Sequence, residues 1–91
     1  MAGTSGATAT VMEVNAPGMG GAFSPASISI HPGDSVTFTN ASGNIHNVTF
    51  ADMHSPIMYG GERWSATFPK PGTYKYVCTY HPGMEGVVNV G

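Results

Sequence analysis

The sequence predicts an all-β protein, a β-sandwich of seven to eight short strands. Apolar and hydroxyl residues alternate with a period of two in several short runs, as in strands with one buried and one hydrated face. Pro-Gly pairs and glycine-rich stretches separate these runs, and no window of eleven or more residues has helical spacing. A chain of 91 residues can build only one core. We expect one domain over residues 8–91, after a flexible leader over residues 1–7 left by processing or expression.

Strands are expected wherever the alternation is clear and a turn bounds it. The turn at residues 31–34 (His-Pro-Gly-Asp) joins the first clear pair of strands, because proline fixes φ and glycine tolerates a positive φ. The predicted strands cover residues 8–15, 27–30, 35–39, 45–50, 64–68, 73–78 and 87–90. Residues 51–62 lack periodicity and are expected to form a long connection, with a short irregular helical turn as one option.

The composition excludes several classes of protein. Charged residues make up 9% of the chain and the formal net charge is −2, so there is no cluster of basic side chains for nucleic acid. The apolar runs are far shorter than the ~20 residues that span a bilayer. A single cysteine, Cys78, excludes an internal disulfide, so this thiol needs another explanation.

A metal-binding motif contains this cysteine. In residues 78–84 (Cys-Thr-Tyr-His-Pro-Gly-Met), a thiol, an imidazole and a thioether follow one another at intervals of three, in Cys78, His81 and Met84. Two imidazoles and a thiolate with a weak axial thioether form the donor set of electron-transfer copper sites. His46 supplies the second imidazole, because it has the same parity as Val48 and Phe50 in a predicted strand and therefore points to the core. The sequence predicts one copper ion bound by these four residues.

Three other interpretations of Cys78 compete with copper. A lone buried cysteine is commonly an inert apolar residue, but here it is followed by His81 and Met84 at ligand spacing. Zinc uses cysteine and histidine but not methionine, and His31 and His54 lie in predicted turn and loop segments, where we expect them to be solvated. A Cys-His nucleophile is disfavoured because no oxyanion loop or cleft is predicted.

These residues give the chain a resemblance to the cupredoxins, closest to the amicyanin group and more distant to plastocyanin and pseudoazurin. The resemblance covers residues 24–90, including residues 33–40, 46–48, 72–78 and 86–90, and the short Cys-x-x-His-x-x-Met loop. It implies an eight-stranded Greek-key sandwich with copper near one end, His46 buried and His81 at the surface as the exit for the electron. It also implies that Asn47 hydrogen-bonds to Thr79 and joins the two ligand segments. An apolar docking patch around His81 would include Met53, Met58, Tyr80 and Pro82, where Tyr80 stands in place of the family's usual proline. Ordinary packing within the loop is the alternative for the two methionines.

The function expected from these features is that of an electron carrier, not an enzyme. The copper would cycle between Cu(I) and Cu(II), and the partners would be redox proteins that a monomer contacts transiently. The resemblance implies an exported protein, in the periplasm or at the outer face of the cell membrane. Three alternatives are a copper chaperone, one module of a larger copper oxidase or nitrite reductase, and a copper-free sandwich used only for binding.

Overall fold

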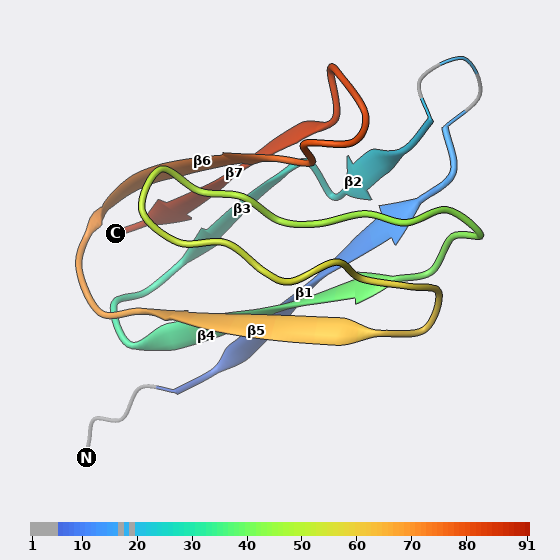
Figure 1. Cartoon of the computed structure of the whole chain (residues 1–91). Coiled ribbons are helices and arrows are strands. Elements are labelled where there is room, and N and C mark those ends of the chain that lie inside the picture. Colours follow the sequence, from blue (N-terminus) through green and yellow to red (C-terminus); the bar gives the residue numbers. More distant parts are fainter. Residues whose placement is uncertain (1–5, 17, 19) are drawn as a thin grey trace.

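The fold is a sandwich of two β-sheets (Figure 1). The computed structural model describes residues 6–16, 18 and 20–91, and in these residues it has no helix, which confirms the predicted all-β class. Residues 1–5 of the predicted leader lie outside the described residues. The seven strands are β1 (Thr8–Val14), β2 (Ala22–Ser24), β3 (Ser27–Ile30), β4 (Asp34–Asn40), β5 (Arg63–Phe68), β6 (Gly72–Val77) and β7 (Glu85–Val90).

Each sheet combines parallel and antiparallel pairs. One sheet has the order β2-β1-β4-β5 and the other β3-β7-β6. β1 runs parallel to β4 and β3 runs parallel to β7, whereas the remaining neighbours are antiparallel. The predicted turn after β3 carries the chain from one sheet to the other. There the backbone N–H of His31 donates to the Asp34 carboxylate at 2.9 Å, and Gly33 has a φ of 92°, which a glycine adopts without strain.

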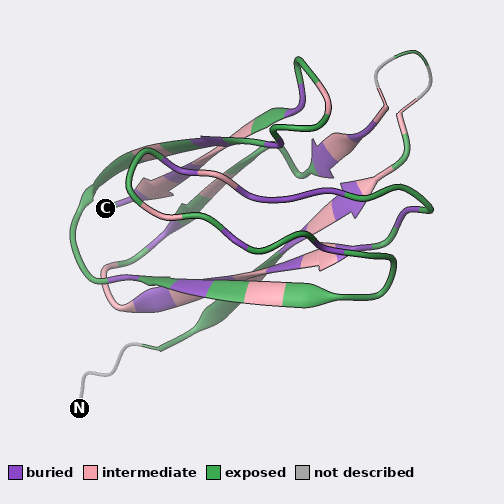
Figure 2. Cartoon of the chain, in the orientation of Figure 1, coloured by how far each residue is buried: buried purple, intermediate pink, exposed green. Residues whose placement is uncertain are grey.

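The core fills the space between the two sheets, where alternate residues of each strand are buried (Figure 2). Phe38 on β4 lies at its centre, with its ring centroid 5.1 Å from that of Tyr76 on β6. Phe23 and Phe50 pack against the same tyrosine, at 4.7 and 5.1 Å. Tyr76 is therefore surrounded by aromatic rings two residues before Cys78, which fixes the end of β6 firmly in the core.

Residues 45–50 do not form the predicted strand. They make only isolated bridges, pairing His46 with Met58, and Thr49 with His54 and Val77. The ladder is interrupted because the Ser55 hydroxyl, instead of a main-chain carbonyl, accepts the N–H of Val48 at 2.9 Å. The predicted parity is nevertheless correct, since His46 and Val48 are fully buried.

Two further differences concern neighbouring segments. Residues 51–62 form the predicted long connection but contain no helical turn, because their backbone bridges back to residues 46–50 instead. The short strand β2 was not predicted, since three residues are too few to show alternation, and its pairing with β1 is what orders it. None of the described residues belongs to a helix that is long and apolar enough to cross a membrane.

Candidate metal centre

The ligand loop lies at one end of the sandwich, between β6 and β7. Cys78 directly follows β6 and continues its alternation, so its side chain points inward and is only 3% exposed. The loop is closed by two main-chain hydrogen bonds, from Cys78 N–H to the Met84 carbonyl at 2.9 Å and from Met84 N–H to the His81 carbonyl at 3.1 Å. Gly83, with a φ of 88°, allows the tight reversal. The loop thus brings three donors round a common point.

His46 reaches this point from a segment 32 residues earlier in the chain. Its backbone is held by paired hydrogen bonds with Met58, at 3.1 and 2.8 Å, and its ring is fully buried. The His46 Nδ1 lies 3.7 Å from the Cys78 Sγ, and the His81 Nδ1 lies at the same distance from this sulfur. The two imidazole ring centroids are 4.8 Å apart. Two imidazoles, one from residues 45–50 and one from the ligand loop, therefore lie next to the same thiol.

Four donors consequently surround one small volume. The ligand atoms of His46, Cys78 and His81 all lie within 4.8 Å of one another, and they form the one such group of histidine, cysteine and acidic residues that the described part of the chain contains. Met84, 1% exposed, is the fourth donor. A Cβ added to Gly21 would lie 2.9 Å from the Met84 Sδ and 2.5 Å from the His46 Cε1, so the thioether and this imidazole border the same small space. Two imidazoles, a thiolate and a thioether fit a single copper ion, because thiolate and thioether suit Cu(I) and imidazole suits both oxidation states.

The burial of His46 also prepares it for a metal. Removal from water lowers the pKa of His46, and a positive charge on His81 would lower it further. A lowered pKa keeps the imidazole neutral, which is the form that binds a metal ion.

Comparisons with known proteins agree with this geometry. The family described as copper binding proteins, plastocyanin/azurin family, matches residues 9–91. The chain belongs to this family. It is 37% identical over 75 residues to amicyanin-alpha of Methylorubrum extorquens, which covers 75% of this chain and 63% of that protein. It is 42% identical over 65 residues to amicyanin of Paracoccus denitrificans, which covers 64% of this chain and 50% of that protein.

Solved structures also resemble this cupredoxin. The structure of a purple cupredoxin from Nitrosopumilus maritimus has a TM-score of 0.82 and 32% identity, and the match covers 91% of this chain and 99% of that one. A copper-containing nitrite reductase from Thermus scotoductus has a TM-score of 0.78 and 29% identity, but the match covers only 22% of that chain. The match spans 49 to 63% of the length of three curated relatives and 85% of another, a plastocyanin of Scenedesmus fuscus.

Two hydrogen bonds join the ligand segments of this cupredoxin beside the thiol. The Asn47 Nδ2 donates to the Thr79 hydroxyl at 2.8 Å, and the Thr79 N–H donates to the Asn47 Oδ1 at 2.9 Å. This is the contact that the family resemblance implies. Because Asn47 follows His46 and Thr79 follows Cys78, the pair fixes the two ligands relative to each other.

The predicted docking patch needs one correction. Met58 is 1% exposed and packs in the core, so it cannot contact a partner. Its backbone bridges to His46, and its side chain belongs to the buried apolar core. Tyr80 is 39% exposed and Pro82 is exposed as well, whereas Met53 is half-buried against the core.

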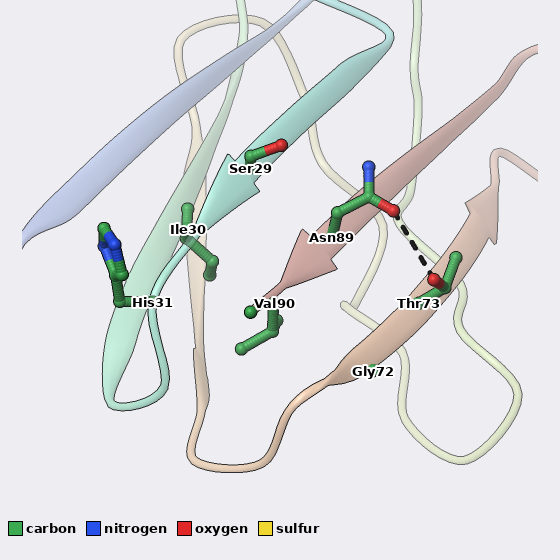
Figure 3. Close-up of a pocket in the computed structure, with 8 residues that line it drawn as sticks. Ser29, Ile30, His31, Gly72, Thr73, Asn89 and Val90 are labelled. Atoms are coloured by element: carbon green, nitrogen blue, oxygen red, sulfur yellow. Dashed lines mark hydrogen bonds between the residues drawn. The ribbon is translucent and has the colours of Figure 1, made fainter.

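Other surface positions agree with expectation or lie away from the cluster. His31 and His54 are exposed, as predicted. The hollow drawn in Figure 3 has a volume of about 400 Å³ and lies where β6 begins and β3 and β7 end, opposite the ligand loop. Thr73 donates to the Asn89 carboxamide across it, at 3.4 Å. Its eight lining residues include one imidazole and no thiol, so it does not offer the donors of a copper site.

Sequence reasoning missed several contributors to the site, among them Gly21 and Ser42. A Cβ on Gly21 would lie 2.5 Å from the His46 ring, so only glycine lets this segment pack on the ligands. Ser42 Oγ lies 2.8 Å from the His46 Nε2. In the sequence, only its position four residues before a ligand histidine marks Ser42 as part of the site. Residues 40–42 (Asn-Ala-Ser) also match the pattern for N-glycosylation, which indicates nothing about the metal site.

Proposed function

We propose that this cupredoxin is a single-electron carrier. The observation that supports the proposal is the cluster of His46, Cys78, His81 and Met84, which offers a complete type 1 copper donor set at one end of a rigid sandwich. Copper bound there would supply the one-electron change between Cu(I) and Cu(II). Solved amicyanin structures that resemble this chain include reduced and oxidised states, in keeping with such a cycle.

The surrounding residues would hold the donors still during electron transfer. Three donors are buried, and the loop that carries Cys78 is closed by its own main-chain hydrogen bonds. Asn47 and Thr79 add two hydrogen bonds across the ligand segments. A site whose ligands are locked by packing and hydrogen bonds rearranges little when its charge changes, which favours fast electron transfer.

The same geometry supports a carrier rather than an enzyme. Catalytic metal sites keep an open position for water or substrate. Here four side chains from the protein converge on the site, and even a Cβ added to Gly21 would collide with two of them, His46 and Met84. We therefore assign no substrate to the copper, and we propose that electrons enter and leave without bonds being made or broken.

The partner would meet the protein at the partly exposed edge of His81. Tyr80 and Pro82 flank this ligand and are exposed, and the exposed side chains of Ile45 and Ile57 belong to the two segments that bridge at the other ligand. Such an uncharged surface fits a small, short-lived contact with a redox protein. With only eight charged side chains in the chain, association should depend weakly on ionic strength. We also propose that the protein is monomeric and exported, as its resemblance to the amicyanin group implies.

The visible spectrum after addition of Cu(II) tests this function. We expect an intense thiolate-to-copper band that ascorbate bleaches and that Cys78→Ser abolishes, while His54→Ala, at an exposed histidine, leaves it unchanged. A colourless Cu(II) complex would falsify the proposal. A copper chaperone would instead release the metal rapidly to a chelator, whereas ligands from two segments of a rigid fold predict slow release.

A further inference from the structure

Ser42 is buried, 8% exposed, and lies against the far side of the His46 ring from the thiol. Its hydroxyl is 2.8 Å from the His46 Nε2, while the Nδ1 of the same ring faces Cys78 at 3.7 Å. Whether Nε2 donates or accepts decides which ring nitrogen has a free electron pair. The answer depends on where the single hydroxyl hydrogen of Ser42 goes.

The orientation of the Asn40 amide can be assigned first. Asn40 is fully buried on β4, and its Nδ2 donates to two main-chain carbonyls, those of Asn44 at 2.8 Å and Met58 at 2.9 Å. Its Oδ1 accepts the N–H of Ser42 at 2.9 Å. The reversed orientation would place an oxygen against two carbonyls and an amino group against an N–H. The Oδ1 is therefore fixed as an acceptor.

The hydroxyl hydrogen of Ser42 is then committed. The nearest acceptor is the Asn40 Oδ1 at 2.7 Å, and the Asn44 carbonyl, also unable to donate, lies at 3.2 Å. Because the hydroxyl has one hydrogen and two neighbours that can only accept, it has none left for the imidazole. The His46 Nε2 is paired only if it carries a hydrogen and donates to Ser42.

We infer that Ser42, oriented by Asn40, is a positioning residue that holds His46 as the Nε2–H tautomer and directs the Nδ1 electron pair at the copper site. This role rests on the proposed function of the site, but it concerns the protein's own hydrogen bonds. Partners of this kind fix the ring and raise the basicity of a ligand histidine, and their loss typically lowers metal affinity about 10- to 100-fold. Ser42 thus affects the orientation and basicity of the buried ligand without itself binding the metal.

The metal-free wild-type protein gives the first test. At a pH where His46 is neutral, long-range ¹H–¹⁵N NMR should show a protonated Nε2, an unprotonated Nδ1 and a slowly exchanging Nε2 hydrogen with a cross-peak to the Ser42 β-hydrogens. An Nδ1–H tautomer would overturn the inference. This measurement needs neither copper nor a variant. It therefore tests the tautomer even if the copper complex lacks the thiolate-to-copper band, and even if a variant does not fold.

Substitution gives the second test, with a matched control at another buried serine. Ser42→Ala removes the acceptor, which should weaken Cu(II) binding about tenfold and, if Cu(I) binding is unchanged, raise the reduction potential by about 59 mV. Ser42→Thr keeps the hydroxyl and should restore the wild-type potential. Ser55→Ala removes a hydroxyl that is 2% exposed and bonds only main-chain groups, so it should leave the potential unchanged.

The outcomes separate positioning from general loosening of the segment. A shift confined to Ser42→Ala and reversed by Ser42→Thr supports the inference. Equal shifts in the Ser42→Ala and Ser55→Ala proteins, or a wild-type potential in both, would overturn it even if the blue band is intact.

Discussion

Replacing Glu13 with leucine should change how the stability of the protein depends on pH. Glu13 lies on β1 and is fully buried, and neither of its carboxylate oxygens has a hydrogen-bond partner among the described residues. Burial raises the pKa of Glu13 from its ordinary 4.5 to about 7. The unfolded chain therefore loses this proton at a lower pH than the folded protein does, and ionisation favours unfolding.

The size of the effect follows from this interval. The stability associated with the protonated carboxyl is fully present below pH 4.5 and is lost as the pH rises through about 7. A difference of about 2.5 between the two pKa values corresponds to about 3.4 kcal/mol, of which roughly 2.5 kcal/mol falls between pH 5 and pH 8. Leucine has no charge to bury. Between pH 5 and pH 8, the free energy of unfolding of Glu13→Leu should therefore increase by roughly 2.5 kcal/mol relative to that of the wild type.

Denaturant unfolding of the metal-free proteins at pH 5, 6, 7 and 8 measures the difference. Contributions from other groups, including His46, whose lowered pKa acts in the opposite sense, cancel between variant and wild type. Glu85→Gln, at an exposed glutamate, is the control and should follow the wild-type curve. A difference between Glu13→Leu and wild type that is constant with pH would refute the reasoning.

Three further substitutions have defined outcomes. Gly21→Ala places a methyl 2.5 Å from the His46 ring and should alter the visible copper band, whereas Gly43→Ala, with nothing within 4 Å, should not. Asn47→Ala removes two hydrogen bonds to the ligand loop and should lower copper affinity about tenfold in a competitive titration. Tyr76→Phe removes a buried hydroxyl that has no partner in the described structure, so denaturant unfolding should show no loss of stability.

Period-two alternation predicted which side chains point inward more reliably than it predicted pairing. The parity of His46 and Cys78 follows from the sequence alone, because successive residues of an extended chain point to opposite sides whether or not a ladder forms. Pairing at residues 45–50 depends on the Ser55 hydroxyl, which replaces a main-chain acceptor from seven residues away. No local pattern reports such a contact.

The spacing in the ligand loop predicted three donors because all three lie in one turn of chain. The residues that hydrogen-bond to the remaining donor, His46, were not predictable in the same way. Ser42 acts on His46 only because the chain between them reverses tightly and Asn40 fixes its hydroxyl. The family position of Met58 is compatible with a docking patch, and its burial and its bridge to His46 are visible only in three dimensions.

The burial of Cys78 makes the chain's only thiol a reporter of opening. At 3% exposure it is shielded from thiol-modifying reagents and from the thiol of a second molecule while the protein is folded. Labelling must then wait for the ligand end of the sandwich to open. With an opening free energy of about 5 kcal/mol, metal-free protein would be labelled roughly 5,000-fold more slowly than the unfolded chain. Disulfide-linked dimers in a preparation would accordingly count molecules that had opened, not molecules that associate in the native state.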